Sequence, residues 1–326
     1  MFQRTLFSLF TVALALLSTG CITLDLMSVV SPSLQENEIS SDGYFSDDKI
    51  LIIDISGIIR SSKGSGFFTR STTPETIKAV LNKARRDDDI KAVVLRINSP
   101  GGEVTATDII HHDLQSFKME TGIPIYAAIM SLGTSGAYYV GTSADRIFAH
   151  PTSIIGSIGV IARLPQYGEL AEKIGYSQIV FKSGENKDLG NPLKAMTEEQ
   201  RLIFQNMIDA SYDRFLEVVA EGRPGYEIAD DLRTIADGRI YTPREAMDLK
   251  LIDDVAYLDE VIERLKESAG IEDMTVITYS HHAGYDRNVY SRLPTQLNLL
   301  NIDLNEAFGA FGDSQAGFHY LWMPAN

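Results

Sequence analysis

The sequence predicts an α/β layered fold in which most strands are parallel. Short apolar runs rich in β-branched residues alternate with stretches whose apolar residues recur at helical spacing. Glycine-containing turns separate the two kinds of segment, and such alternation is typical of strands covered by helices. No linker-like composition interrupts the pattern before about residue 280, which favours a single domain over residues 48–280.

The predicted elements follow one another from Lys49 onward. Residues 50–55 form a β-branched run that predicts a buried strand, and the Gly/Ser-rich residues 60–71 predict a loop. Residues 72–75, with Pro74 in the first turn, are typical of a helix start. The repeating pattern then predicts strands over 91–97, 123–130, 145–149, 153–161 and 177–182, and helices over 103–118, 135–143 and 197–220.

Two of these helices have a clear apolar face. The helix over 103–118 is expected to turn four residues inward, namely Ala106, Ile110, Leu114 and Phe117. The helix over 197–220, capped by Thr197, carries Phe204, Met207, Ile208, Phe215 and Val219 on one face.

The charge of the chain argues against nucleic acid as a partner. The chain has 326 residues, 44% hydrophobic and 22% charged, and a net charge of −15. Nucleic-acid binding needs a basic face, so this charge argues against it.

The N-terminus predicts export to a bacterial cell envelope. Arg4 precedes an apolar stretch over 6–17, which is too short for a membrane span and typical of a signal sequence over residues 1–20. Cys21 is the single cysteine, and its position resembles a bacterial lipoprotein processing site, although Ser18 departs from the usual leucine. An uncleaved anchor or ordinary cleavage are the alternatives. We expect a tether over 21–47, a membrane-anchored domain facing the periplasm or exterior, and a less regular tail over 281–326; which membrane holds it stays open.

Two glycine-flanked turns predict an acyl-transfer site. The first, residues 97–102, follows one apolar strand, and the second, residues 131–139, follows the next. Glycine lets backbone N–H groups approach a ligand closely, and Ser135 lies between small residues at a strand-to-helix turn.

The base that would activate Ser135 stays open on these grounds. His111 and His112 lie on the helix after the first turn and are expected on its solvent side, so His150 is the histidine candidate. Lysine is the alternative, because an amine can accept the serine proton when burial keeps it neutral. Lys182 and Lys187 both lie near a glycine turn, and spacing alone does not separate them.

Five motifs in order resemble the signal peptide peptidase A family. They are residues 98–102 (Asn-Ser-Pro-Gly-Gly), 134–139 (Thr-Ser-Gly-Ala-Tyr-Tyr), 155–160 (Ile-Gly-Ser-Ile-Gly-Val), 183–188 (Ser-Gly-Glu-Asn-Lys-Asp) and 236–242 (Ala-Asp-Gly-Arg-Ile-Tyr-Thr). The resemblance covers about 48–270. It implies a Clp-protease/crotonase-like layered fold with repeated strand-strand-helix units, and a serine endopeptidase that works in membrane-associated oligomers without a cofactor or metal.

The resemblance also implies residue roles. Ser135 would be the nucleophile, Lys187 the general base, and Ser157 the hydroxyl that orients the lysine. The N–H groups of Gly102 and Gly136 would form the oxyanion hole. Thr134 and Ala137 depart from the family pattern beside the nucleophile, which puts substrate preference in doubt. Tyr138 and Tyr139 are expected to pack rather than to react.

Three functions are considered. The resemblance implies the first, a peptidase that cleaves remnant signal peptides or other membrane-derived peptides, and it implies a homo-oligomeric ring in which Ser135 of one copy meets Lys187 of its neighbour. The second is a crotonase-like acyl-CoA enzyme, which shares the oxyanion hole and needs no nucleophilic serine. The third is a non-catalytic envelope scaffold of the same fold.

Overall fold

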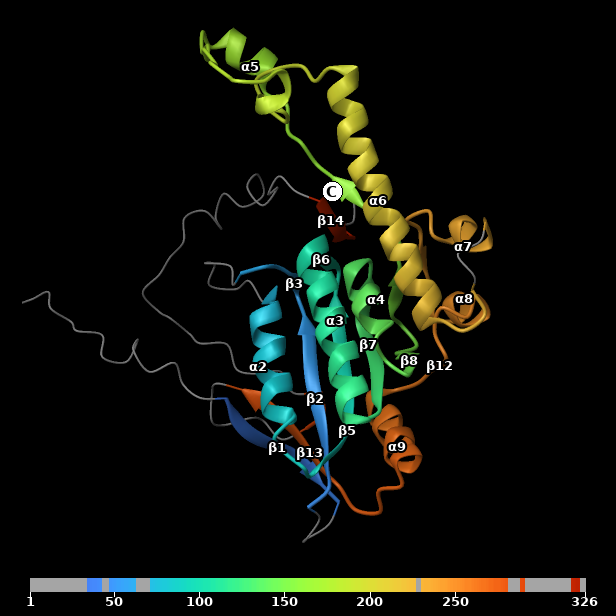
Figure 1. Cartoon of the computed structure of the whole chain (residues 1–326). Helices are drawn as coiled ribbons and strands as arrows, with labels where there is room; N and C mark the ends of the chain where they lie inside the picture. The colour runs from blue at the N-terminus through green and yellow to red at the C-terminus, as the bar shows by residue number, and fades with distance from the viewer. Residues whose placement is uncertain are drawn as a thin grey trace, which may run out of the picture.

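A nine-stranded sheet forms the centre of the molecule (Figure 1). The computed structural model describes residues 34–42, 47–62, 71–226, 230–280, 288–290 and 318–322. The expected signal sequence and Cys21 lie outside these residues. Neighbouring strands in the sheet are, in order, β1 (Gln35–Ser41), β13 (Thr275–Ser280), β2 (Lys49–Ser56), β5 (Ile90–Ser99), β7 (Ile125–Thr134), β8 (Arg146–Ala149) and β12 (Asp254–Val255). Every pair from β13 to β12 is parallel, as predicted, and β1 is antiparallel.

Apolar residues alternate between two cores on the two faces of this sheet. Leu51 and Ile53 on β2 pack into the larger core, whereas Ile50 and Ile52 pack into the smaller one. Helices α2 (Pro74–Ala84), α3 (Val104–Thr121) and α4 (Gly136–Gly141) cover the first face, and α9 (Leu258–Ala269) covers the second (Figure 1). A sheet covered on both faces explains why its strands are nearly continuous apolar runs.

A smaller sheet lies at the carboxyl end of the parallel strands. Its order is β10 (Ile161–Ala162), β14 (Phe318–Leu321), β6 (Gly101–Glu103), β3 (Ile58–Ile59) and β4 (Ser71–Thr72). Two further short strands of the large sheet lie at this end. β9 (Ile154–Gly156) pairs with the end of β7, and β11 (Ile240–Tyr241) pairs with β9. The glycine turns therefore lie where the two sheets meet.

The predicted helices form with small shifts. The cap of α2 is Thr73, whose side chain accepts from the Thr76 N–H, one residue later than predicted. The four inward residues predicted on α3 are all buried. Helix α6 (Glu198–Gly222) begins at the Thr197 capping box, as expected. Two short helices, α7 (Asp230–Ile235) and α8 (Pro243–Asp248), follow it.

The apolar face of α6 is fully buried only along its second half. Phe215 and Val219 are buried, whereas Met207 is 47% exposed. The first half extends beyond both sheets together with residues 163–197, which we call the arm (Figure 1). The arm contains α5 (Gly168–Lys173) and a 3-10 turn, η1 (Glu185–Asp188).

The strand predicted over 177–182 was wrong. These residues lie in the arm without regular structure, and Ile179 is 81% and Phe181 94% exposed. A β-branched run becomes a strand only where a neighbouring strand pairs with it. None of the described strands lies beside this segment.

Both predicted ends of the domain need correction. Residues 35–41, assigned to the tether, form β1, whose Ile39 is buried in the smaller core. Residues 318–321, assigned to the tail, form β14, which pairs with β10 and β6 in the smaller sheet. The polar composition of residues 35–41 hides the first strand because five of its seven side chains face solvent.

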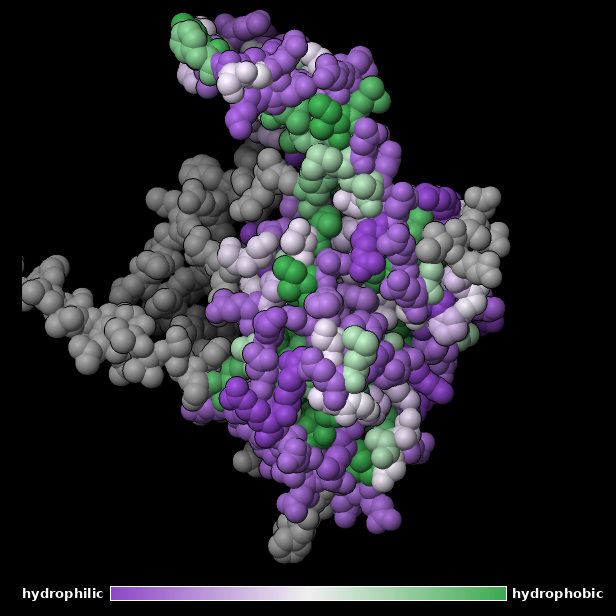
Figure 2. Space-filling model, in the orientation of Figure 1, coloured by the Kyte–Doolittle hydropathy of each residue, from purple (hydrophilic) through white to green (hydrophobic). Residues whose placement is uncertain are grey.

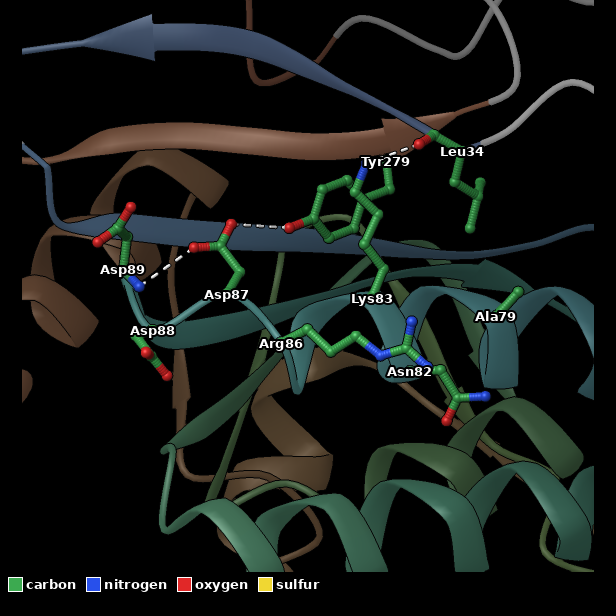
Figure 3. A pocket seen from close by; sticks show the side chains of 9 residues that line it. All are labelled: Leu34, Ala79, Asn82, Lys83, Arg86, Asp87, Asp88, Asp89 and Tyr279. Atoms are coloured by element: carbon green, nitrogen blue, oxygen red, sulfur yellow. Dashed lines mark hydrogen bonds between the residues drawn. The ribbon is translucent and has the colours of Figure 1, made fainter.

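A polar pocket lies beside the turn that precedes β5 (Figure 3). Asp87 to Asp89, Lys83 and Tyr279 are among its lining residues. The Tyr279 hydroxyl donates to Asp87, and Lys83 donates to the Leu34 carbonyl. These two hydrogen bonds join β13 and the residue before β1 to the end of α2 and the turn after it. Among the described helices, none is long and apolar enough to span a membrane.

Candidate active site

The two glycine turns lie side by side, as predicted from their order. They follow the adjacent parallel strands β5 and β7, where Ser99 pairs with Gly133. The Asn98 side chain accepts from the Leu132 N–H at 3.2 Å, which ties the first turn to the second. The carboxyl edge of a parallel sheet is where such folds place their ligands.

Ser135 adopts a strained conformation at the start of α4. Its φ of 53° and ψ of −123° are unusual for a residue with a side chain. The residue is 2% exposed, and its N–H donates to the Gly156 carbonyl at 2.7 Å. A sharp strand-to-helix turn of this kind presents a serine hydroxyl at the edge of a sheet.

Only glycine fits at two positions of the first turn. A Cβ on Gly102 would lie 1.9 Å from the Ile59 carbonyl oxygen, and Gly101 has a φ of +97°. The Gly101 N–H donates to the Ser99 hydroxyl at 3.1 Å. Because the Gly101 N–H is already bound, Gly102 is the better candidate donor for an oxyanion. The Gly136 N–H lies beside this turn, 2.6 Å from the point where a Gly101 Cβ would be.

Ser157 lies directly beside Ser135. Thr134 pairs with Gly156, so the residues that follow them are adjacent. Ser157 has a φ of 49°, is nearly buried, and donates its N–H to the Arg239 carbonyl at 2.7 Å. The structure thus brings Ser135, Ser157, Gly102 and Gly136 together.

Lys187 is not part of this cluster within one chain. It lies in η1 on the arm, exposed, and no hydrogen bond or ion pair engages its ammonium among the described residues. Lys182 differs, because its ammonium contacts Asp188 at 2.7 Å and the Glu185 carbonyl at 2.5 Å. Figure 1 shows the arm standing clear of both sheets.

The rings of His150 and His111 both contact residues other than Ser135. The His150 Nδ1 contacts the Thr152 hydroxyl at 2.9 Å, and its ring lies edge-on to Tyr257. His111 was expected on the solvent side of its helix, and this was wrong: it is buried, edge-on to Tyr139 at 5.2 Å. Burial lowers the pKa of His111 to about 4, so the ring is neutral at pH 7.

The two tyrosines after Ser135 are fully buried and hydrogen-bonded. The Tyr138 hydroxyl donates to the Leu251 carbonyl at 2.7 Å, and that of Tyr139 donates to Asp108. Burial raises the pKa of both hydroxyls. The Thr134 hydroxyl is buried without a hydrogen-bond partner in the described part of the chain. No group of three or more metal-binding side chains occurs among the described residues.

The chain matches two family models over this site. The model for peptidase family S49 matches residues 118–272, and that for Clp protease matches residues 68–155. A relative from Enterococcus faecium named "Putative signal peptide peptidase SppA" is 34% identical over 72% of this chain and 68% of its own length. The chain belongs to peptidase family S49.

Two other relatives are longer proteins, so this chain covers a smaller share of each. "Protease 4" of Haemophilus influenzae is 29% identical over 69% of this chain but 35% of its own length. "Serine protease SPPA, chloroplastic" of Arabidopsis thaliana is 29% identical over 69% of this chain and 33% of its own length. A solved structure of a membrane-bound stomatin-specific protease covers 67% of this chain and 84% of its own at 18% identity, with a TM-score of 0.42. On the two family models and the Enterococcus faecium relative, the chain is a serine peptidase with a Clp-protease-like α/β fold.

Sequence reasoning missed one residue of the site. Tyr320 lies against the Gly101–Gly102 turn, because a Cβ on Gly101 would lie 2.1 Å from the Tyr320 carbonyl oxygen. No local pattern in the sequence places a strand at residues 318–321 against a turn at residues 101–102.

Proposed function

We propose that this S49 peptidase is a membrane-associated endopeptidase that uses a Ser–Lys dyad. The observation that carries the proposal is the strained Ser135 turn, whose hydroxyl-bearing residue is flanked by the Gly136 and Gly102 N–H groups. A nucleophile beside two converging backbone donors is the arrangement that acyl transfer needs.

In the proposed reaction the Ser135 Oγ attacks the carbonyl carbon of a peptide bond. The neutral amine of Lys187 takes the hydroxyl proton and then gives it to the leaving amine. The N–H groups of Gly102 and Gly136 stabilise the negative charge on the carbonyl oxygen. Water activated by the same amine then hydrolyses the acyl-enzyme. Ser157, next to Ser135, would orient the amine.

The lysine would come from a second copy of the chain. Within one chain Lys187 stands on the projecting arm, and Lys182 is engaged by Asp188. The arm also exposes large apolar side chains, including Leu170, Ile174, Ile179 and Phe181. Figure 2 shows apolar side chains gathered where the arm meets α6. Exposed apolar area of this kind favours contact with another protomer.

A head-to-tail contact through the arm would close into a ring. Each boundary would then pair Ser135 of one copy with Lys187 of the next, and the sites would face an enclosed chamber. The name of the Enterococcus faecium relative, a putative signal peptide peptidase, favours remnant signal peptides as substrates. The signal-like N-terminal sequence favours an envelope location beside the membrane. The N-terminal lipid at Cys21 would provide the anchor.

Subunit mixing tests the shared site. Ser135→Ala and Lys187→Ala, each inactive alone, are dissociated, mixed and reassembled. We expect part of the activity to return, because some boundaries pair an intact serine with an intact lysine. The matched control mixes Ser135→Ala with Ser135→Ala/Lys182→Ala, which should stay inactive. Demonstrably mixed oligomers without recovered activity, or an active monomer, would refute the shared site.

A further inference from the structure

An unpaired hydroxyl lies beside one of the proposed oxyanion donors. Thr107 is the fourth residue of α3, the helix whose N-cap, Glu103, follows the Gly101–Gly102 turn. It is fully buried, and its Oγ1 has no hydrogen-bond partner among the described residues. A Cβ on Gly136 would lie 2.7 Å from this oxygen. The hydroxyl therefore lies against the Gly136 backbone, where α3 and α4 are side by side (Figure 1).

An unbonded hydroxyl is unusual for a buried threonine in a helix. Such a hydroxyl ordinarily donates to a carbonyl three or four residues earlier. Thr121, at the other end of α3, donates to the Phe117 carbonyl at 2.7 Å, and Thr142 donates to the Tyr139 carbonyl at 2.6 Å. Thr107 makes no such bond in the described part of the chain. Because a buried hydroxyl without a partner is destabilising, and valine would fill the same space without it, the hydroxyl is best explained by a partner that arrives during the reaction.

The hydroxyl lies on the side to which the Gly136 N–H points. Gly136 is the first residue of α4, so no carbonyl of that helix accepts from its N–H. At a helical φ the N–H bond and the Cα–Cβ direction are nearly eclipsed about the N–Cα bond, so both point to the same side of the residue. The Thr107 oxygen and the Gly136 N–H thus border one small space. The Tyr320 carbonyl oxygen, 3.1 Å from the same Cβ position, also borders it but accepts no hydrogen bond from Thr107.

We propose that the Thr107 hydroxyl is a third donor to the oxyanion, beside the N–H groups of Gly102 and Gly136. The assignment rests on the proposed role of Ser135. When the Ser135 Oγ bonds to the carbonyl carbon, the π electron pair of the carbonyl moves onto its oxygen. The Thr107 O–H donates a hydrogen bond to that oxygen and keeps its own proton. When the tetrahedral intermediate collapses, the electron pair re-forms the carbonyl, and the amine leaves with the proton that the base delivers.

A donor that gains its partner during the reaction raises kcat. The neutral carbonyl of a bound substrate is a weaker acceptor than the oxyanion, so the hydrogen bond strengthens as the charge develops. Loss of the Thr107 hydroxyl should therefore lower kcat and leave KM almost unchanged.

Thr107→Val tests this in the full chain, because it removes the donor and keeps the shape of the side chain. With a synthetic signal peptide that carries a fluorophore and a quencher, we expect kcat to fall ~10- to 100-fold and KM to stay within ~2-fold. The urea midpoint of unfolding should be equal or higher, because an unpaired buried hydroxyl is gone. Thr105→Val is the matched control, since the same change on the exposed side of α3 should leave kcat unchanged.

A second pair of variants isolates the hydroxyl without valine. Thr107→Ser and Thr107→Ala both lose the methyl group, and they differ only in the hydroxyl. Thr107→Ser should keep kcat within ~3-fold of the unmodified chain, whereas Thr107→Ala should be ~10- to 100-fold slower. A role in packing alone would slow both alike. Equal kcat for Thr107→Ser and Thr107→Ala, or an unchanged kcat for Thr107→Val, would overturn the proposal.

Failure of the proposed nucleophile would show separately. A fluorophosphonate probe should label the unmodified chain at Ser135, and it should label Thr107→Val at least ~10-fold more slowly, because the phosphonyl oxygen takes the place of the oxyanion. Labelling of Ser135 at equal rates in the two proteins would reject the role of Thr107 alone. No labelling of Ser135, with full peptidase activity in Ser135→Ala, would reject the proposed dyad and the oxyanion assignment with it.

Discussion

The Ser135 N–H donates to the Gly156 carbonyl at 2.7 Å, so the Ser135 turn and the Ser157 turn are joined in one unit. Gly156 has a φ of +97°, and a Cβ there would lie 2.7 Å from the Tyr241 ring and 3.0 Å from the Arg239 carbonyl oxygen. Contacts from β9 and β11 therefore hold the backbone beside Ser135 in place.

Gly156→Ala should disturb this unit. We expect a loss of unfolding free energy of about 1–3 kcal/mol, from positive φ and steric contact together, and a fall in kcat/KM larger than the stability loss explains. Gly175→Ala is the matched control, because Gly175 has a φ of +72° with nothing within 4 Å of its Cβ position. If both variants behave alike, contact with Tyr241 and Arg239 does not position Ser135.

Lys187→Ala should abolish peptidase activity, by ~10³-fold or more, while unfolding in urea is unchanged. Lys182→Ala should cost less than ~10-fold, because it removes a contact to Asp188 within the arm. The activity of the unmodified chain should rise with pH as the amine becomes neutral. If the pH dependence of activity disappears in His150→Ala, the base is the histidine instead.

His111 should make the fold sensitive to mild acid. Its folded pKa of about 4 lies below the ordinary 6.5, so the unfolded chain binds the proton more readily. Stability from this residue is complete above about pH 6.5 and falls as the pH drops toward 4, by up to about 3 kcal/mol. Urea unfolding across this range should show a shallower pH slope for His111→Leu. His112→Leu, on the exposed side of α3, should keep the slope; equal slopes in all three proteins would contradict the assignment.

Phe181→Glu should weaken assembly. The side chain is 94% exposed in one chain, and burying a charge at the proposed boundary is unfavourable. Light scattering should show smaller particles and activity should fall with them. Met119→Glu places the same charge at an exposed apolar site outside the arm and should leave both unchanged. Intact assemblies of Phe181→Glu would exclude this residue from the boundary.

Cys21 should be the first residue of the mature chain and carry lipid. Intact-mass spectrometry of membrane-extracted protein should show the added mass, and Cys21→Ser should block processing there. A mature chain that begins elsewhere and lacks lipid contradicts the lipoprotein assignment.

The strands and helices of the sheet were predictable because their signals are local. β2, β5 and β7 are buried on both faces, so each is a continuous apolar run, and Thr197 marks the start of α6 in its own sequence. The adjacency of Ser135 and the Gly102 turn follows from the order of parallel strands.

Other features were not predictable because they depend on distant partners. β1 is largely polar and is a strand only because β13 pairs with it. The run at 177–182 has the composition of a strand but lacks a partner strand among the described residues. His111 packs against Tyr139, and Tyr320 packs against Tyr139 and Phe215. These contacts join residues from different elements, so no local sequence pattern predicts them.

With the proposed anchor at Cys21, the position of β1 would set how far from the membrane the enzyme can work. With the sheet beginning at Gln35, thirteen residues separate it from Cys21. At full extension that chain spans at most about 45 Å, roughly half the reach of a tether that ended at residue 47. A lipid-anchored ring of such protomers would be confined to a thin layer above the bilayer. Peptides released from the membrane would pass through that layer first, whereas proteins deeper in the compartment would lie beyond its radius.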